Sequence, residues 1–135
     1  MNTLVALIRV AGVVLLAMAA ANIVAPGKLG YRENLALVAP IVRQVFVLHA
    51  VYILMVVLGI AGLCLFFAPE LAGASLLGRA ISGFLALFWI SRTALQIVYI
   101  DREIKRANPL ENAAYTFATA ALGGVFALAA WGVIV

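Results

Sequence analysis

The stretch VFVLHAVYILMVVLGIAGLCLFFA, residues 45–68, decides the fold of this chain. It contains no Asp, Glu, Lys or Arg, and most of its side chains are aliphatic or aromatic. Since an α-helix rises about 1.5 Å per residue, a run of this length spans the roughly 30 Å hydrocarbon core of a bilayer. The stretch is therefore predicted to form a transmembrane helix.

Three further runs of the same kind place the whole chain in the membrane. They cover residues 4–24, 76–100 and 109–135. Hydrophobic residues make up 67% of the chain and charged residues 10%, whereas soluble domains have about 45–50% and about 25%. We therefore expect an all-α integral membrane four-helix bundle. Residues 1–135 are expected to form one transmembrane domain, because no connection is long enough to fold separately.

Prolines and capping residues mark the expected helix ends. Pro26 and Pro69 are expected to stop the first two spans, since proline lacks the backbone N–H that continues a helix. The sequence Asn-Pro-Leu-Glu at residues 108–111 is typical of a capping box and predicts that the last span begins near residue 109. The third span is expected to run past the membrane to about Arg106. Residues 31–40 predict a short amphipathic helix in the headgroup plane.

Basic residues predict the orientation of the chain. They concentrate in the first and third connections, at Lys28, Arg32, Arg43, Arg102, Lys105 and Arg106. The positive-inside rule therefore predicts a multi-pass protein of the cytoplasmic membrane with these two connections in the cytoplasm and both termini outside. The net charge of +4 follows from this bias. It indicates contact with anionic lipid headgroups of the bilayer and gives no reason to expect a nucleic-acid partner.

Small residues are expected to bring the helices together, since packing in lipid depends on close approach. They form stripes in three of the spans: Ala17 and Ala21; Gly59 and Gly62; Ala113, Thr116, Ala120, Gly124 and Ala127. These stripes fit packing within the bundle, and they equally fit a homo-oligomer or contact with a partner membrane subunit. The sequence leaves these uses open.

Polar side chains within the spans are expected to gather in the cytoplasmic half of the bundle. Arg92, Gln96 and Tyr99 follow i, i+4, i+7 spacing and share one helix face. Counting about 1.5 Å per residue places Thr119 at the depth of Arg92 and Tyr115 one turn nearer the cytoplasm. The same count brings polar groups from the first two spans to this half. The candidate ligand-binding residues are Arg92, Gln96, Tyr99, His49, Tyr52, Thr119, Tyr115 and Asn22.

Arg92 is the residue that most needs an explanation. A basic group in a bilayer costs about 2.5 kcal/mol or more unless it is paired or solvated, and the sequence places no Asp or Glu at its depth. One interpretation is that an anionic or carbonyl-bearing small ligand completes the site. The other is that the side chain extends toward the cytoplasm and bonds Gln96, Tyr99 and loop carbonyls.

Other kinds of site find little support in the sequence. A single histidine, His49, cannot supply two axial ligands to a haem, and no metal-ligand cluster accompanies it. The sequence contains no recognisable nucleophile with a base and no phosphate-binding loop. It therefore identifies no catalytic residue, no metal site and no cofactor.

Two resemblances add to this interpretation. The segments VRQVFVLHAVYI, residues 42–53, and LFWISRTALQIVYID, residues 87–101, resemble a family of small, uncharacterised bacterial four-span membrane proteins. The segment RTALQIVY, residues 92–99, is similar to the third helix of the MAPEG family of glutathione-dependent membrane enzymes. That second resemblance implies a trimer in which Arg92 helps to activate the glutathione thiol. Residues 42–55 lack the carboxylates and asparagine with which that family binds glutathione.

The sequence therefore predicts a small accessory or ligand-binding membrane protein with a polar pocket in its cytoplasmic half, rather than an enzyme. A MAPEG-like glutathione-dependent enzyme is one alternative. A quinone- or lipid-binding subunit of a larger membrane complex is the other.

Overall fold

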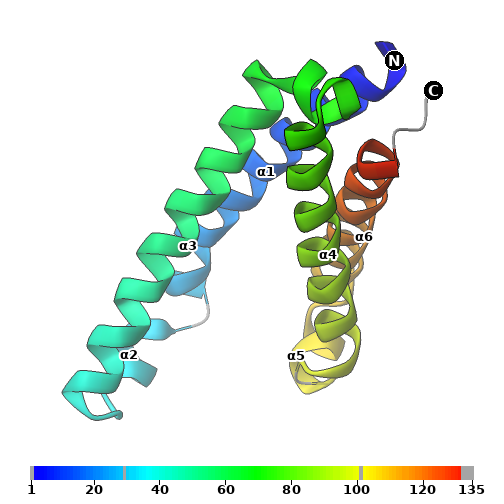
Figure 1. The fold of residues 1–135 in the computed structure, drawn as a ribbon. Helices are drawn as coiled ribbons and strands as arrows, with labels where there is room; N and C mark the ends of the chain where they lie inside the picture. The colour runs from blue at the N-terminus through cyan, green and yellow to red at the C-terminus, as the bar shows by residue number, and fades with distance from the viewer. Residues whose placement is uncertain (1, 29, 101, 132–135) are drawn as a thin grey trace. The chain divides into compact units, whose positions relative to one another are not determined.

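The computed structural model of the protein describes residues 2–28, 30–100 and 102–131, and over these residues it is helical and contains no strand. The helices are α1 (Asn2–Lys28), α2 (Tyr31–Leu35), α3 (Pro40–Phe66), the π-helix η1 (Glu70–Ala74), α4 (Leu76–Val98), α5 (Arg102–Ala107) and α6 (Pro109–Trp131) (Figure 1). Four of them, α1, α3, α4 and α6, are long and apolar enough to cross a membrane. The all-α class and the four predicted spans are confirmed, and the chain is a multi-pass membrane protein.

The third span is shorter than expected, because α4 ends at Val98 and does not continue to Arg106. At this end the backbone N–H of Ile100 donates to the carbonyl of Leu95, which closes the last turn. The Lys105 Nζ on α5 then donates to the carbonyl of Ile97 at 2.7 Å. A helix end leaves carbonyls without partners, and a lysine side chain satisfies one of them here.

The prolines mark the helix ends unequally. The expectation that Pro26 stops the first span is wrong, since α1 continues through it to Lys28. Pro26 lies two residues before the end of α1, and its missing N–H removes only one backbone hydrogen bond. Pro69 follows the end of α3 as predicted, and α6 begins at Pro109 as predicted.

The chain divides into two compact units, which are described separately here. Unit 1 consists of Met1–Ala11 and Phe67–Val135, and unit 2 of Gly12–Phe66. α1 therefore contributes its first part to unit 1 and the remainder to unit 2.

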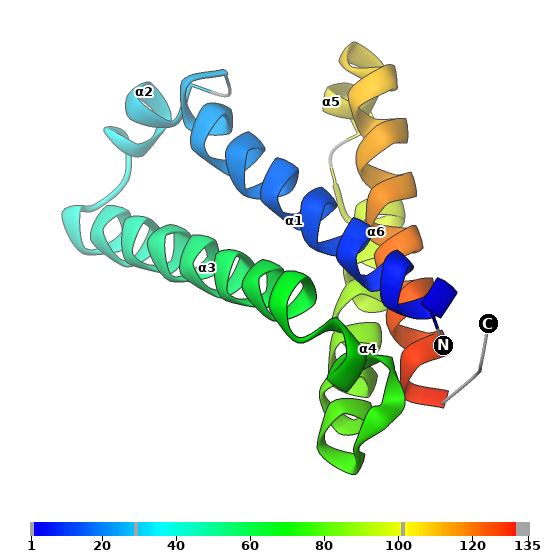
Figure 2. The same ribbon diagram turned by 90° about the horizontal axis from the view of Figure 1, so that it is seen from above.

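In unit 2, α1 and α3 lie side by side (Figure 2). Their close approach is at Gly12, where a Cβ atom would lie 3.0 Å from the Cβ of Cys64 and 3.0 Å from the Cγ of Leu65. Gly59 and Gly62 face open space. The expectation that these two glycines pack the helices of the bundle is therefore wrong within this unit, and Gly12 performs that role.

In unit 1, α4 and α6 lie side by side and antiparallel. The packed face of α6 consists of Thr119, Leu122, Gly123, Phe126 and Ala129. A Cβ atom on Gly123 would lie 2.8 Å from the Cγ1 of Ile90, whereas Gly124 faces open space. The predicted stripe through Ala120 and Gly124 is thus not the face that packs on α4. The prediction considered only the small residues of α6. The packed face also contains the bulky Leu122 and Phe126, which are buried beside Gly123.

The start of α4 is capped by Ser75 and packs against η1. The Ser75 Oγ accepts a hydrogen bond from the Gly78 N–H at 3.0 Å and caps the helix. The buried Ser82 Oγ donates to the carbonyl of Leu71 at 2.7 Å. A Cβ atom on Gly78 would overlap the carbonyl of Glu70. Glycine at this position is what allows the π-helix to approach α4.

Candidate ligand-binding groove

Three side chains form a hydrogen-bonded chain across α4 and α6. The Arg92 Nη1 donates to the Gln96 Oε1 at 3.2 Å, and the Gln96 Nε2 donates to the Asn112 Oδ1 at 3.0 Å. Gln96 is 7% exposed, whereas Arg92 and Asn112 are half-buried. The three residues together connect the last two turns of α4 with the first turn of α6.

The charge on Arg92 fixes the direction of this chain. A guanidinium group has donors and no acceptor, so Gln96 must turn its oxygen toward Arg92 and its NH₂ group toward Asn112. Asn112 must then accept through its oxygen, which leaves its own NH₂ group directed elsewhere. The Asn112 Nδ2 makes no hydrogen bond to the described residues, so it is available as a donor to a ligand.

Aromatic and hydroxyl contacts hold the two helices in register beside this chain. The Arg92 Cζ lies over the Tyr115 ring, 5.1 Å from its centre, in cation–π geometry. The Thr93 Oγ1 and the buried Thr119 Oγ1 lie 2.9 Å apart. These contacts confirm the predicted register, in which Thr119 lies at the level of Arg92 and Tyr115 lies one turn away.

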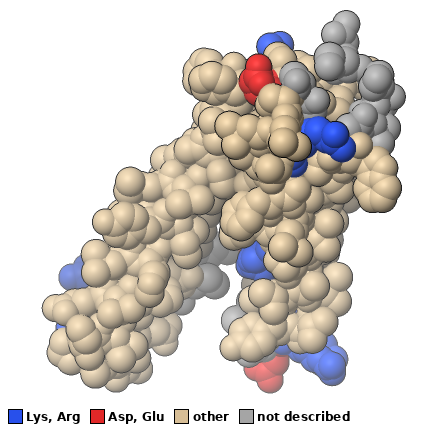
Figure 3. All heavy atoms as spheres, in the orientation of Figure 1, with Lys and Arg blue, Asp and Glu red and all other residues tan. Residues whose placement is uncertain are grey.

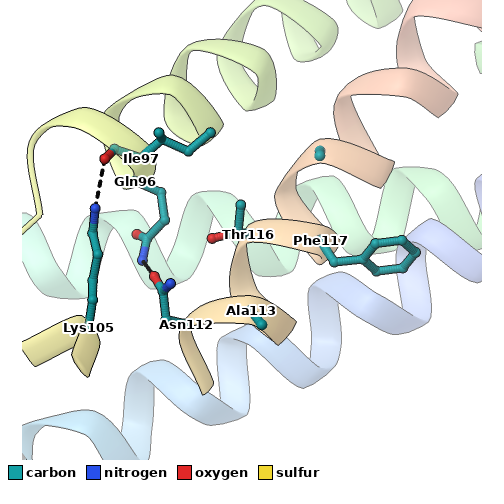
Figure 4. Close-up of a pocket in the computed structure, with 8 residues that line it drawn as sticks. Gln96, Ile97, Lys105, Asn112, Ala113, Thr116 and Phe117 are labelled. Atoms are coloured by element: carbon teal, nitrogen blue, oxygen red, sulfur yellow. Dashed lines mark hydrogen bonds between the residues drawn. The ribbon is translucent and has the colours of Figure 1, made fainter. Parts of the chain in front are cut away.

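A groove of about 420 Å³ lies where α4, α5 and α6 meet. Its lining residues are Gln96, Ile97, Lys105, Asn112, Ala113, Thr116, Phe117 and Ala120. Lys105, Gln96 and Asn112 gather at one end of the groove and Phe117 lies at the other, with the Thr116 side chain between them (Figure 4). The groove is therefore polar at one end and apolar at the other.

Hydrogen-bond donors dominate the polar end. Lys105 has three N–H donors, of which the Ile97 carbonyl takes one. Lys105 is the one charged side chain among the described residues that line the groove, and no carboxylate is among them. Figure 3 shows both acidic and basic side chains at the end of unit 1 near α5. The polar end can therefore hold an acceptor-rich or negatively charged group.

The structure brings four of the eight predicted site residues together. Gln96 lines the groove, Arg92 donates to Gln96 and lies over the Tyr115 ring, and Thr119 is buried beside Thr93. Tyr99 ends α4 with its side chain 80% exposed. The other three, which belong to unit 2, are His49, Tyr52 and Asn22.

The residues of unit 2 are described within that unit alone. His49 and Tyr52 are exposed on α3, and the Asn22 Nδ2 donates to the Met18 carbonyl at 3.1 Å. Their membership of the site stays a prediction.

Sequence reasoning missed Asn112 and Lys105 as groove residues. Asn112 lies three residues before Tyr115 and seven before Thr119, so helical spacing already placed it on the polar face of α6. Lys105 was expected on a continuation of the third span beyond the membrane. The chain instead breaks between α4 and α5, and the Lys105 Nζ donates to the carbonyl of Ile97.

Comparisons with protein families, with curated proteins and with solved structures found no match to this chain. Both resemblances stay predictions. Within the described part of the chain, the hydrogen bond of Arg92 goes to Gln96 and its ring contact to Tyr115. Likewise, no group of three or more His, Cys, Asp and Glu in that part is placed to hold a metal ion.

Proposed function

We propose that the protein is a small ligand-binding membrane protein whose site is the groove between α4, α5 and α6. Its ligand carries an anionic or carbonyl-bearing group, which accepts hydrogen bonds from Lys105 and Asn112. The observation that carries this proposal is the directed chain from Arg92 through Gln96, which leaves the NH₂ group of Asn112 free to donate.

The donor set explains the choice of ligand. An ammonium and an amide NH₂ group offer donors to oxygen atoms that bear negative charge or are strongly polarised. A cationic ligand would meet Lys105 without a carboxylate in the described lining to balance it. Arg92 does not line the groove itself and acts as a positioning residue, because it holds the Gln96 amide in one orientation.

Native mass spectrometry of the purified protein in mild detergent tests this proposal. We expect a small molecule to co-purify with the wild type, and extraction identifies it. Asn112→Leu removes a donor and Arg92→Leu frees the Gln96 amide, so both variants should lose the bound species.

Arg79→Leu is the matched control for loss of charge. Arg79 also lies on α4, but it donates to the carbonyls of Ala130 and Trp131 near the end of α6. This variant should keep the ligand. A wild type that stays empty, or a ligand that survives Asn112→Leu, would overturn the proposed function.

We also propose that the polar end of the groove faces the cytoplasm and that the protein lies in the cytoplasmic membrane. The basic residues of α5, Arg102, Lys105 and Arg106, support this orientation through the positive-inside rule. The same rule puts both termini outside.

Cysteine labelling with a membrane-impermeant maleimide tests the orientation in a Cys64→Ala background. Leu110 and Leu76 are 81% and 83% exposed at the starts of α6 and α4. We expect Leu110→Cys to react in inverted vesicles and Leu76→Cys to react in spheroplasts. The reverse pattern would overturn the orientation and would leave the ligand site itself unaffected.

A further inference from the structure

The groove changes from polar to apolar along the direction that crosses the membrane. α4 and α6 are each 23 residues long, which is enough for about 34 Å at about 1.5 Å per residue. Their ends therefore lie near the bilayer surface. Asn112 lies in the first turn of α6, and Ala120 lies about 12 Å deeper by the same rise per residue. The polar end is at headgroup depth and the apolar end is in the hydrocarbon region.

The apolar end is a strip along α6. Ala113, Phe117 and Ala120 follow i, i+4, i+7 spacing, line the groove and are exposed. Phe117 is 77% exposed, and the two alanines leave room beside its ring. A hydrocarbon chain can lie along this strip and remain continuous with the surrounding lipid.

The polar end matches a phosphodiester. Lys105 supplies one positive charge, and a phosphodiester carries one negative charge with oxygen acceptors only. The Asn112 NH₂ group offers further donors beside it. A zwitterionic headgroup such as phosphocholine would bring a second cation close to Lys105, so charge complementarity favours a lipid of net negative charge.

We propose that the occupant of the groove is an anionic phospholipid, and this inference rests on the proposed function. The phosphate accepts hydrogen bonds from Lys105 and Asn112, and one acyl chain lies along Ala113, Phe117 and Ala120. The ligand therefore enters from the bilayer rather than from water.

Titration of the delipidated protein, followed by native mass spectrometry, tests the proposal. The probes are phosphatidylglycerol, phosphatidylcholine with the same acyl chains, and glycerophosphoglycerol, which is the phosphodiester headgroup without chains. We expect phosphatidylglycerol to bind about tenfold more tightly than phosphatidylcholine, and glycerophosphoglycerol to bind at least about a hundredfold more weakly than phosphatidylglycerol.

Neighbouring alanines provide a matched pair of variants for the acyl chain. Ala120→Leu fills the apolar end and should weaken phosphatidylglycerol binding about tenfold. Ala121 is also exposed on α6 but does not line the groove, so Ala121→Leu should bind as the wild type does. Lys105→Met should lower the affinity for phosphatidylglycerol to the level of phosphatidylcholine.

The outcomes that overturn the proposal are distinct from those that overturn the proposed function. Equal binding of glycerophosphoglycerol and phosphatidylglycerol would show that no acyl chain is held. If a short-chain quinone bound the groove equally well in the wild type and in Lys105→Met, the ligand would be a carbonyl compound rather than an anion. Lipid binding insensitive to both Lys105→Met and Ala120→Leu would indicate only surrounding lipid. In the first two cases the groove is still a ligand site. Failure of phosphatidylglycerol to bind would overturn the lipid proposal alone, because the proposed function is tested by the species that co-purifies with the wild type.

Discussion

The guanidinium carbon of Arg92 on α4 lies 5.1 Å from the centre of the Tyr115 ring on α6. The ring gives a partly desolvated cation an attractive surface, and such contacts contribute from about 0.5 to about 2 kcal/mol. This contact, together with Gln96, accounts for the stability of an arginine inside an apolar span. It also means that the ring of Tyr115, rather than its hydroxyl, is what Arg92 requires.

Tyr115→Leu is therefore expected to lower the free energy of unfolding by about 1 kcal/mol. Tyr115→Phe keeps the ring and should retain most of that stabilisation. Denaturant titration in detergent micelles measures both variants. Tyr99→Leu, which alters a tyrosine that is 80% exposed, serves as the control and should leave stability unchanged. Equal losses from Tyr115→Phe and Tyr115→Leu would show that the hydroxyl is the important group.

The hydrogen bond between Gln96 and Asn112 predicts energetic coupling between these two residues. Either single change to leucine leaves the other amide without its partner, which costs about 1–3 kcal/mol for the buried Gln96 and less for the half-buried Asn112. In the double variant both amides are absent, so the losses should not add. We expect a coupling of about 1 kcal/mol in a double-mutant cycle, within the range for membrane helices. Strict additivity would contradict the bond.

Gly123 and Gly124 are adjacent but predict opposite results. Gly123→Ala would push its Cβ against Ile90, at 2.8 Å from Cγ1 and 3.3 Å from the backbone nitrogen. We expect a loss of about 1–3 kcal/mol from this overpacking. Gly124→Ala meets open space and should be neutral or slightly stabilising. Thermal unfolding in detergent distinguishes the two variants.

Gly124 also tests self-association. Gly124 is exposed and is not used to pack α6 on α4, so we propose that it contacts a second copy of the chain. Crosslinking in membranes should then decrease for Gly124→Leu while the folded monomer persists. Unchanged crosslinking would remove this surface as a contact.

Gly78 predicts a further difference within α4. Gly78→Ala would force its Cβ into the Glu70 carbonyl, so η1 would have to move away from α4. Gly83→Ala would meet only the Cβ of Ala130 at an ordinary 3.7 Å. We expect about 2 kcal/mol of destabilisation for the first variant and none for the second. A tolerant Gly78→Ala variant would show that the π-helix packs differently.

The sequence predicted the spans well because the length and the polarity of a run are sufficient to define a transmembrane helix. It also predicted the register of Arg92 against Tyr115 and Thr119, because rise per residue fixes depth in antiparallel helices. It failed on the packed face of α6. One residue corresponds to about 100° of helix rotation, so the choice between Gly123 and Gly124 depends on which bulky neighbours are buried.

The groove itself was harder to predict than the polar face. Its donors depend on a break between α4 and α5, which a continuous polar and apolar pattern through Arg106 did not reveal. The contribution of Asn112 depends on side-chain reach and on the orientation of the Gln96 amide. These are properties of rotamers, and spacing alone does not define them.

The two ends of unit 1 differ in when their contacts can form during synthesis. Leu71 and Ser82 are 11 residues apart, so their hydrogen bond can close as soon as the beginning of α4 has been made. Arg79 must wait for the carbonyls of Ala130 and Trp131, which are 51 and 52 residues later. The η1–α4 corner can therefore form long before the end of α6 has been made, and the Arg79 hydrogen bonds close after it.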